Sequence, residues 1–343
     1  MISKFEEESL EIRDVEWFLE VVNGLDLLRM PLKELRKLLG RCPCMDDAWF
    51  LGMVEAKKKA GDNVYEVEYK EERRCEMVCN CIAICGKGAE QRMAVANNRG
   101  QINILHTKTG KRIPIVGPSW EPLSCPQAVA FNSTGELYVC DCDDFHEDKH
   151  HIKVFDRRGW YVRGFGEWGG GEGQFRNPSG ICFTADGNLV VADSGNHRVQ
   201  VLRGDGTFLR AFGSEGSGHS LLQIPLEVCS RPDGSIAVLD FGNGRVAVFD
   251  GEGGFVKNIG LRHSDPGRFA IPSSIATGRC GEIIICDDEQ EDVRVFNPEG
   301  ELLQVIGPGG DSEVEWQGRL QCVCTDAEGR LFIVDGNSLV VLS

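Results

Sequence analysis

The sequence lacks the features that mark membrane proteins, secreted proteins and familiar enzymes. No apolar run approaches 18 residues, so no bilayer-spanning helix is expected. The first residues, 1–8, are acidic rather than apolar, which is unlike a secretory signal. No Ser-His-Asp set, paired carboxylates or phosphate-binding loop stands out. These absences predict a cytoplasmic protein, or alternatively a nuclear one, and they favour a non-enzymatic function.

Cysteine is abundant, but the spacing that structural zinc sites use is missing. There are 15 cysteines and no C-x2-C pair, whereas structural zinc is usually held by such pairs. Most of the cysteines fall in predicted strands, where a thiol behaves as a small hydrophobic side chain. The sequence therefore predicts reduced thiols and no cofactor.

The charge balance narrows the choice of partners. The net charge is −16 at pH 7, which opposes binding to nucleic acid and to anionic membranes. Hydrophobic residues make up 41% of the chain, enough for a buried core. Proteins are therefore the expected partners, nucleic acid is not expected, and the oligomeric state is left open.

A repeat of nearly constant length organises most of the chain. Five segments end in a small apolar residue followed by glycine, and successive glycines are 49, 47, 47 and 47 residues apart. These glycines are Gly117, Gly166, Gly213, Gly260 and Gly307. In each unit a hydrophobic run ends in an acidic residue, namely Asp141, Asp193, Asp240, Asp287 and Asp335, and a first unit has Asn97 there.

Each unit reads as four short strands joined by tight turns. In residues 175–213, apolar runs of three to five residues alternate with turns rich in Asp, Asn and Gly. A period of 40–50 residues with four strands is typical of propeller blades, which bury both faces of each sheet against their neighbours. We therefore predict an all-β fold, a six-bladed β-propeller over residues 62–343.

The ends of the predicted propeller are expected to pair. The last unit, 320–343, has only three strands, and an alternating segment at 64–70 has no place in the first unit. We expect residues 64–70 to supply the missing outer strand of the last blade, which would close the ring and remove two open edges. The alternative is that 64–70 is an edge or linker strand.

Residues 1–61 differ in pattern from the rest. Apolar residues recur at helical spacing, and Pro31 and Gly40 suit the start and end of a helix. We predict a small N-terminal α-helical segment of three short helices. It either packs on the propeller or binds a partner helix.

The best-preserved repeat resembles the NHL family. The resemblance is carried by Gly169–Pro178, Asp186–Leu189, Ala192-Asp193 and Asn196–Val201, and it extends over about 62–343. It implies a six-bladed NHL propeller. Those family members that bind RNA do so through a basic propeller face, and the tripartite-motif members owe ubiquitin-ligase activity to RING and B-box cysteine/histidine ladders. This chain has neither ladder, so the resemblance implies the propeller without that catalytic part.

One insertion has the composition of a metal site. Residues 141–151 offer carboxylate and imidazole ligands at Asp141, Asp143, Asp144, His146 and His150. Their spacing fits neither an EF-hand nor HExxH. The segment is either a solvated polar loop or a weak site for a divalent cation.

The residues Asp193, Asn196 and Arg198 form a charged cluster that recurs in other units. Recurrence favours a structural role, in which the aspartate holds turn amides and the arginine reaches a carboxylate.

Tryptophans supply the candidate anchors for a partner. Trp120, Trp160, Trp168 and Trp316 fall in or beside loops between blades, although each could instead pack beneath its loop. We therefore predict a non-enzymatic scaffold that binds proteins through the propeller-face loops. The alternatives are a ubiquitin-pathway or RNA-binding regulator, as the resemblance implies, and a metal-dependent propeller lyase or hydrolase.

Overall fold

The computed structural model divides into two compact units, Met1–Val67 and Glu68–Ser343. The described residues are 71–76, 81–97, 100–115, 117, 123–142, 150–260, 269–308, 310 and 314–342. The predicted helical segment 1–61 therefore lies outside the described part of the chain.

The second unit contains six antiparallel four-stranded sheets, which are the six predicted blades. Blade 1 consists of β2 (Cys81–Cys85), β3 (Arg92–Ala96), β4 (Ile102–His106) and β5 (Arg112–Pro114). Blade 2 consists of β6 (Pro126–Phe131), β7 (Leu137–Cys142), β8 (His150–Phe155) and β9 (Tyr161–Phe165). Blade 3 consists of β10 (Pro178–Phe183), β11 (Leu189–Asp193), β12 (Arg198–Leu202) and β13 (Phe208–Phe212).

The remaining blades repeat this plan. Blade 4 consists of β14 (Pro225–Ser230), β15 (Ile236–Asp240), β16 (Arg245–Phe249) and β17 (Phe255–Ile259). Blade 5 consists of β18 (Pro272–Thr277), β19 (Ile283–Asp287), β20 (Asp292–Phe296) and β21 (Leu302–Ile306). Blade 6 consists of β22 (Leu320–Thr325), β23 (Leu331–Asp335), β24 (Ser338–Leu342) and β1 (Glu71–Glu76). Three short 3-10 turns are Gly88–Glu90, Ser194–Asn196 and Phe241–Asn243. An all-β six-bladed propeller is thus confirmed.

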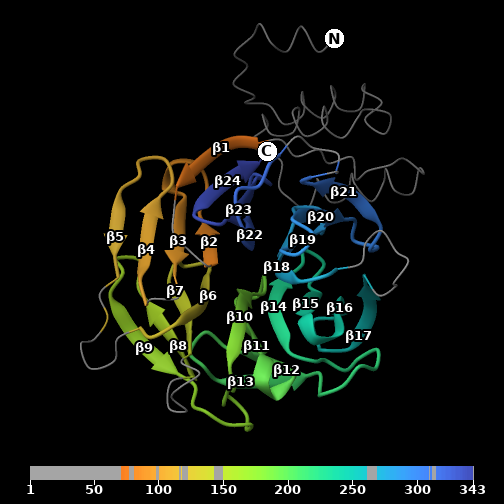
Figure 1. Ribbon diagram of the computed structural model, residues 1–343. Coiled ribbons are helices and arrows are strands. Elements are labelled where there is room, and N and C mark those ends of the chain that lie inside the picture. The colour runs from red at the N-terminus through yellow and green to blue at the C-terminus, as the bar shows by residue number, and fades with distance from the viewer. Residues whose placement is uncertain are drawn as a thin grey trace, which may run out of the picture. The chain divides into compact units, whose positions relative to one another are not determined.

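The first strand of each repeat lies nearest the axis of the ring. Figure 1 shows β2, β6, β10, β14, β18 and β22 around the centre, and neighbouring members of this set are in contact. Because the strands of a blade alternate in direction, the connections between blades and the turns between second and third strands lie on one face. We call it the connection face. The other hairpins of each blade lie on the opposite, hairpin face.

The ring is closed by β1, which pairs with β24 from the other end of the chain. The register joins Glu71 to Leu342 and Glu76 to Ser338. The segment 64–70, which was predicted to occupy this position, lies outside the described residues. The strand that the structure describes as the fourth of blade 6 is therefore Glu71–Glu76.

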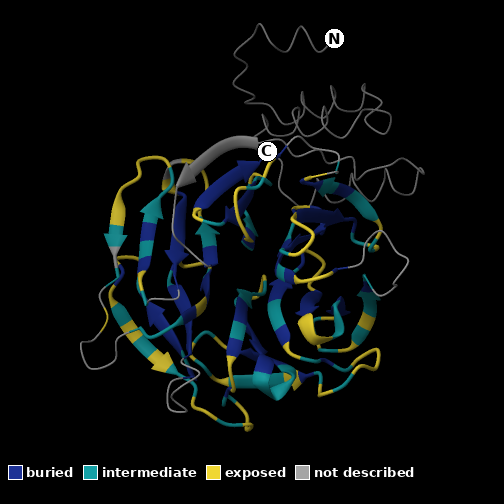
Figure 2. Ribbon diagram, viewed as in Figure 1, coloured by how far each residue is buried: buried dark blue, intermediate teal, exposed yellow. Residues whose placement is uncertain are grey.

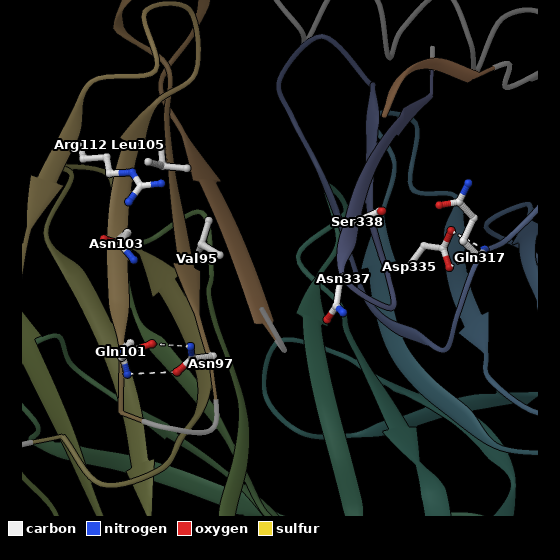
Figure 3. A pocket seen from close by; sticks show the side chains of 10 residues that line it. All are labelled: Val95, Asn97, Gln101, Asn103, Leu105, Arg112, Gln317, Asp335, Asn337 and Ser338. Carbon is white, nitrogen blue, oxygen red and sulfur yellow. Dashed lines mark hydrogen bonds between the residues drawn. The ribbon is translucent and has the colours of Figure 1, made fainter. Parts of the chain in front are cut away.

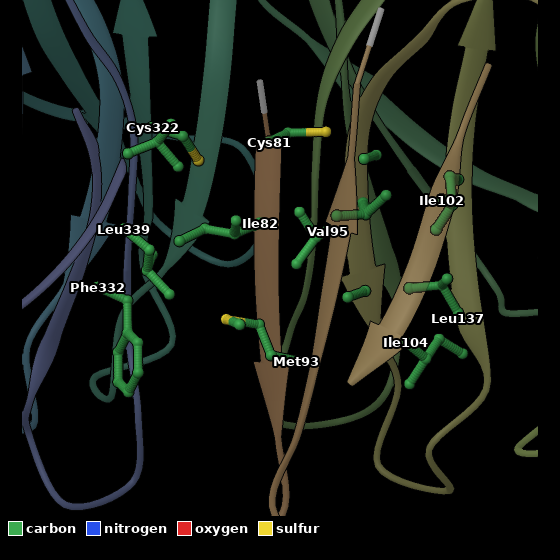
Figure 4. Packing of buried hydrophobic residues seen from close by; sticks show 14 of the residues in the cluster. Cys81, Ile82, Met93, Val95, Ile102, Ile104, Leu137, Cys322, Phe332 and Leu339 are labelled. Carbon is green, nitrogen blue, oxygen red and sulfur yellow. The ribbon is translucent and has the colours of Figure 1, made fainter. Parts of the chain in front are cut away.

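The core lies between the blades rather than inside one sheet. Every residue of β11, β15, β19 and β23 is buried, because both faces of a second strand pack against neighbouring blades (Figure 2). The cluster in Figure 4 shows this packing where the ring closes: Ile82 and Met93 of blade 1 lie opposite Phe332 and Leu339 of blade 6.

The glycines that mark the repeat provide space for a side chain from the next connection. Phe175, Leu222 and Phe269 are buried, each three residues before the proline that starts an inner strand. A Cβ at Gly166 would lie 2.7 Å from the ring of Phe175, and one at Gly213 would lie 2.4 Å from Leu222. The backbone at Gly166 also has φ 95°, a left-handed conformation that glycine adopts readily.

We expect Phe175→Ala to lower the free energy of unfolding by about 3–5 kcal/mol, because it leaves a cavity between blades. The matched control is Phe241→Ala, whose side chain is 38% exposed. Denaturant unfolding followed by circular dichroism measures both changes. Equal losses in the two variants would contradict the assigned role of Phe175 in packing between the blades.

Candidate functional site

A buried aspartate at the end of the second strand organises the connection face. In blade 3, Asp193 is fully buried and accepts hydrogen bonds from the Arg176 amide at 2.7 Å and from the Asn196 side chain at 2.9 Å. It also accepts from Arg198 Nε at 2.8 Å and from Gln200 Nε2 at 3.0 Å. The carboxylate is therefore fully occupied by groups of the same face.

The arginine of this cluster extends the contact to the connection between blades. The guanidinium of Arg198 donates to the carbonyl oxygens of Gly170, Gly171 and Gln174 at 2.9, 2.6 and 3.0 Å. Asn196 donates to the carbonyl of Gly169 at 2.8 Å. The cluster thus fixes the glycine-rich loop through contacts within the propeller.

Blade 4 repeats this arrangement, and blade 5 alters it. Asp240 accepts from the Gln223 amide and from Arg245 Nε, both at 2.7 Å. In blade 5, Asp287 accepts from the amide of Ile271 at 3.0 Å, while Arg294 pairs with Asp292 at 3.0 Å. Burial is the main cause that raises the pKa of Asp292 to about 6, with Arg294 opposing it.

The two candidate metal ligands that the structure describes, Asp141 and His150, make other contacts. Asp141 is 3% exposed and accepts from Lys153 Nζ at 2.9 Å and from the amides of Ser124 and Cys125. His150 Nδ1 accepts from the Asn177 amide at 3.3 Å. In the described part of the chain, no three His, Cys, Asp or Glu side chains are grouped as metal ligands. The other three candidates, Asp143, Asp144 and His146, lie outside it.

The candidate tryptophans do not share one surface. Trp160 follows the β8–β9 turn on the hairpin face and is 57% exposed. Trp168 lies in the connection to blade 3, 38% exposed, with the Arg176 guanidinium 5.0 Å from its ring centre. Trp316 is partly buried in the connection to blade 6. Trp120 lies outside the described residues.

Exposed apolar side chains instead gather where blades 4 and 5 begin. Ile224 and Ile271 immediately precede the inner strands β14 and β18, and they are 43% and 38% exposed. Phe241, 38% exposed, begins the turn after β15. In blade 3 the corresponding turn residue, Ser194, donates to the carbonyl of Pro225 at the start of blade 4. The repeat therefore places Phe241 beside the start of blade 5. We call Ile224, Phe241 and Ile271 the apolar crescent.

Ile224 adopts a backbone conformation that is unfavourable for its residue type. Its φ is 53°, in the left-handed region, where a β-branched residue is an outlier. Its amide donates to His197 Nδ1 at 3.1 Å. In blade 3 the same position is Asn177, with φ 47°, and asparagine tolerates this region. Neither solvation nor backbone preference favours isoleucine here.

A pocket of about 390 Å³ adjoins the crescent near the axis. It is bounded by Ile224 and Leu226 on the side of blade 4, by Ser194 and His197 of blade 3, and by Gln127 of blade 2. This volume is at the small end of the range for ligand pockets. It suits one side chain or a short segment better than a large cofactor.

A larger groove of about 750 Å³ lies between blades 1 and 6. Figure 3 shows Asn103 and Arg112 on one wall and Gln317 and Asn337 on the other. On the first wall, the side chains of Asn97 and Gln101 are hydrogen-bonded at 2.9 Å. The lining is therefore mostly polar, and the groove lacks exposed apolar side chains of the kind found in the crescent.

Among the six innermost strands, which the structure describes in full, one carries a carboxyl side chain. Glu227 lies in β14 at a position where the inner strands of blades 2, 3, 5 and 6 have Ala, Gly, Ser or Cys. Its Oε2 accepts from the amide of Ile275 at 2.6 Å. Burial is the main cause that raises the pKa of Glu227 to about 7, while hydrogen bonds from Ser274 and Ile275 of blade 5 act to lower it.

Sequence comparison identifies the repeat but gives no relative with a known activity. The family model of the NHL repeat matches residues 175–202, which span β10 to β12. The chain is a six-bladed propeller with an NHL repeat in blade 3. No curated protein sequence matches it.

Solved structures similar to this propeller include enzymes and binding proteins. Virginiamycin B lyase from Staphylococcus aureus is 12% identical with a TM-score of 0.52, over 79% of this chain and 83% of the lyase. A gluconolactonase from Xanthomonas campestris is 18% identical with a TM-score of 0.56, over 78% and 87%. A chain of a nidogen/laminin complex is 17% identical with a TM-score of 0.54, over 68% and 81%. At these identities the likeness shows the fold alone and does not decide whether the propeller is an enzyme.

The apolar crescent was not predicted, although a comparison of the repeats shows apolar residues where other blades have polar ones. The propeller has Asp-Phe-Gly-Asn at 240–243 where blade 3 has Asp-Ser-Gly-Asn, and Ile224 and Ile271 replace the asparagine before proline. No helix in the described residues has the length and hydropathy needed to cross a bilayer.

We expect Asp240→Asn to lower the free energy of unfolding by about 3–5 kcal/mol, because Arg245, 2% exposed, would keep its charge without a carboxylate. Arg319→Gln is the control, because the Arg319–Asp288 pair is at the surface, with Arg319 78% exposed, where ion pairs contribute little to stability. Denaturant unfolding at pH 7 measures both variants. A larger loss in the control would contradict the assigned role of the buried carboxylate.

We expect the stability of the propeller to fall as pH rises from about 4.5 to 7. Over this range the folded protein retains protons on Glu227 and Asp292, with pKa values of about 7 and about 6, that the unfolded chain has released. Glu227→Gln should remove the part of this pH-dependent loss of stability that comes from Glu227, which is at most about 3 kcal/mol. Urea unfolding at several pH values tests this, and an unchanged slope in the variant would refute it.

Proposed function

We propose that this protein is a non-enzymatic interaction scaffold that binds protein partners through the connection face of the propeller. The observation that carries the proposal is the exposure of Ile224, Phe241 and Ile271 on one side of the axis. Exposed apolar clusters on a soluble surface commonly mark interaction sites. The buried aspartate clusters support the proposal as well, because they hold the surrounding loops in fixed positions before a partner arrives.

Two of the tryptophans that the sequence predicted as partner anchors lie on the same face as the apolar crescent. Trp168 and Trp316 belong to connections on the same face, so either one can extend a contact that begins at the crescent. Trp168 is the better candidate, because it is exposed and Arg176 already holds its ring in place. Trp160 would serve a separate surface on the hairpin face.

Two other functions have weaker support. The NHL repeat is the reason to consider an RNA-binding or ubiquitin-pathway regulator, and the net charge of −16 opposes RNA. The similarity in fold to a lyase and a gluconolactonase is the reason to consider a metal-dependent enzyme. The described residues supply no grouped ligand set for that chemistry.

The test is differential capture by the full-length chain. Wild type, the double variant Ile224→Asn/Phe241→Ser, Trp168→Ala and the control Val162→Thr are used to capture proteins after ribonuclease treatment. Residue 162 lies on the outer strand β9 and is 47% exposed. We expect proteins bound by wild type and by the control to fall about tenfold or more with the double variant, as for interface residues worth more than 1 kcal/mol.

Three results would count against the proposal. Capture that is equal for all four proteins would place any binding site elsewhere. Loss of capture after ribonuclease treatment alone would favour the RNA-binding alternative. Retention of the same partners by residues 1–61 expressed alone would assign binding to the N-terminal segment.

A further inference from the structure

The apolar crescent is a local departure from the repeat rather than a property of every blade. The residue before the inner strand is Cys125, Asn177, Ile224, Ile271 or Arg319 in blades 2 to 6. The residue after the buried aspartate is Cys142, Ser194, Phe241, Asp288 or Gly336. Large apolar residues occupy these positions only in blades 4 and 5 of this set. At these two positions, large apolar residues are therefore confined to one sector of the connection face, at blades 4 and 5.

The side chains beyond this sector carry an excess of negative charge. The described connections and turns of this face expose six carboxylates, namely Glu167, Glu172, Glu215, Glu289, Glu291 and Glu315. They expose two arginines, and each has a partner: Arg176 lies over the Trp168 ring, and Arg319 pairs with Asp288 at 2.6 Å. A ligand with positive charge is therefore favoured near the crescent, and a polyphosphate is disfavoured.

The dimensions of the site fit a chain segment. The pocket of about 390 Å³ beside Ile224 accommodates one apolar side chain, and the crescent continues from it over blades 4 and 5. Ile224 is held in its left-handed conformation with its amide bonded to His197, so the apolar surface is presented in a fixed geometry. Strain of this kind at an exposed residue is common at binding sites.

From these observations, and on the basis of the proposed function, we propose that the ligand of the crescent is a basic linear peptide segment of a partner protein. An aliphatic or aromatic side chain of the segment packs on Ile224, Phe241 and Ile271. Flanking lysine or arginine residues face the surrounding carboxylates. The apolar contacts supply affinity, and the charges supply the rate and selectivity of association.

The test is selection of a random displayed-peptide library on the full-length protein at low salt. We expect the enriched peptides to share an apolar residue flanked by Lys or Arg. A synthetic peptide of that sequence should lose affinity roughly tenfold or more with Phe241→Ser, which copies blade 3. It should bind unchanged to Val256→Thr, a control on outer strand β17 that is 53% exposed. Raising the salt concentration should weaken binding to wild type.

The variant Ile224→Asn separates a loss of peptide binding from a loss of folding, because the two have opposite effects on the midpoint of thermal unfolding. It copies Asn177 at the equivalent position, so we expect it to raise the midpoint of thermal unfolding while it weakens peptide binding. A variant that binds less because it is misfolded would show a lower midpoint instead. Lower stability together with unchanged peptide affinity would overturn the assignment of Ile224.

The remaining outcomes separate this inference from the proposed function. Enrichment of acidic or uncharged peptides, or no enrichment, overturns the basic-peptide assignment, even where differential capture still succeeds. A dimer in analytical ultracentrifugation that Phe241→Ser dissociates would make a second copy the occupant. Competition of the selected peptide by a random RNA oligonucleotide would also overturn it. Failure of differential capture as well would remove the proposed function itself.

Discussion

The buried carboxylate at the end of the second strand in blades 2 to 6 is the constraint on which the connection face depends. A long connection must cross from the rim of one blade to the axis of the next, and its backbone amides need partners. Asp193 and Asp240 supply them, and Arg198 and Arg245 bind the carbonyl oxygens of the same connections. Because these charges are paired and fully hydrogen-bonded, they can be buried, and the loops above them are held in place.

The fold could be predicted from the sequence because its signals are local and recur. Glycine at a step of 47 residues marks the place where Phe175 or its counterpart must fit beside Gly166. An aspartate directly after a hydrophobic strand marks the buried carboxylate that binds the amides of the connection. Both patterns depend on contacts within one repeat or between neighbours, so a period in the sequence is enough to reveal them. The exact strand that closes the ring, Glu71–Glu76, depends on pairing across the whole chain and has no such local signal.

The candidate site was harder to predict, because it depends on exposure and backbone conformation rather than on residue type. In the sequence, Phe241 cannot be distinguished from the many buried hydrophobic residues. Only the structure shows that it is exposed, beside the start of blade 5. Ile224 shows its unfavourable conformation only through its φ angle. Tryptophan was the reasonable choice from composition, yet Trp160 and Trp168 lie on opposite faces, and sequence distance does not reveal which face a loop occupies.

The register of the closing strand also determines how the ring responds to mechanical load. Glu71 is paired with Leu342, so the outer ends of β1 and β24 lie together at one end of the ladder. A force that pulls these two points apart loads the hydrogen bonds of the ladder one after another, in the unzipping geometry. It does not load all of them at once, as a shearing force would. Tension applied through both ends of the propeller would therefore peel β1 away first and release blade 6 before any other blade.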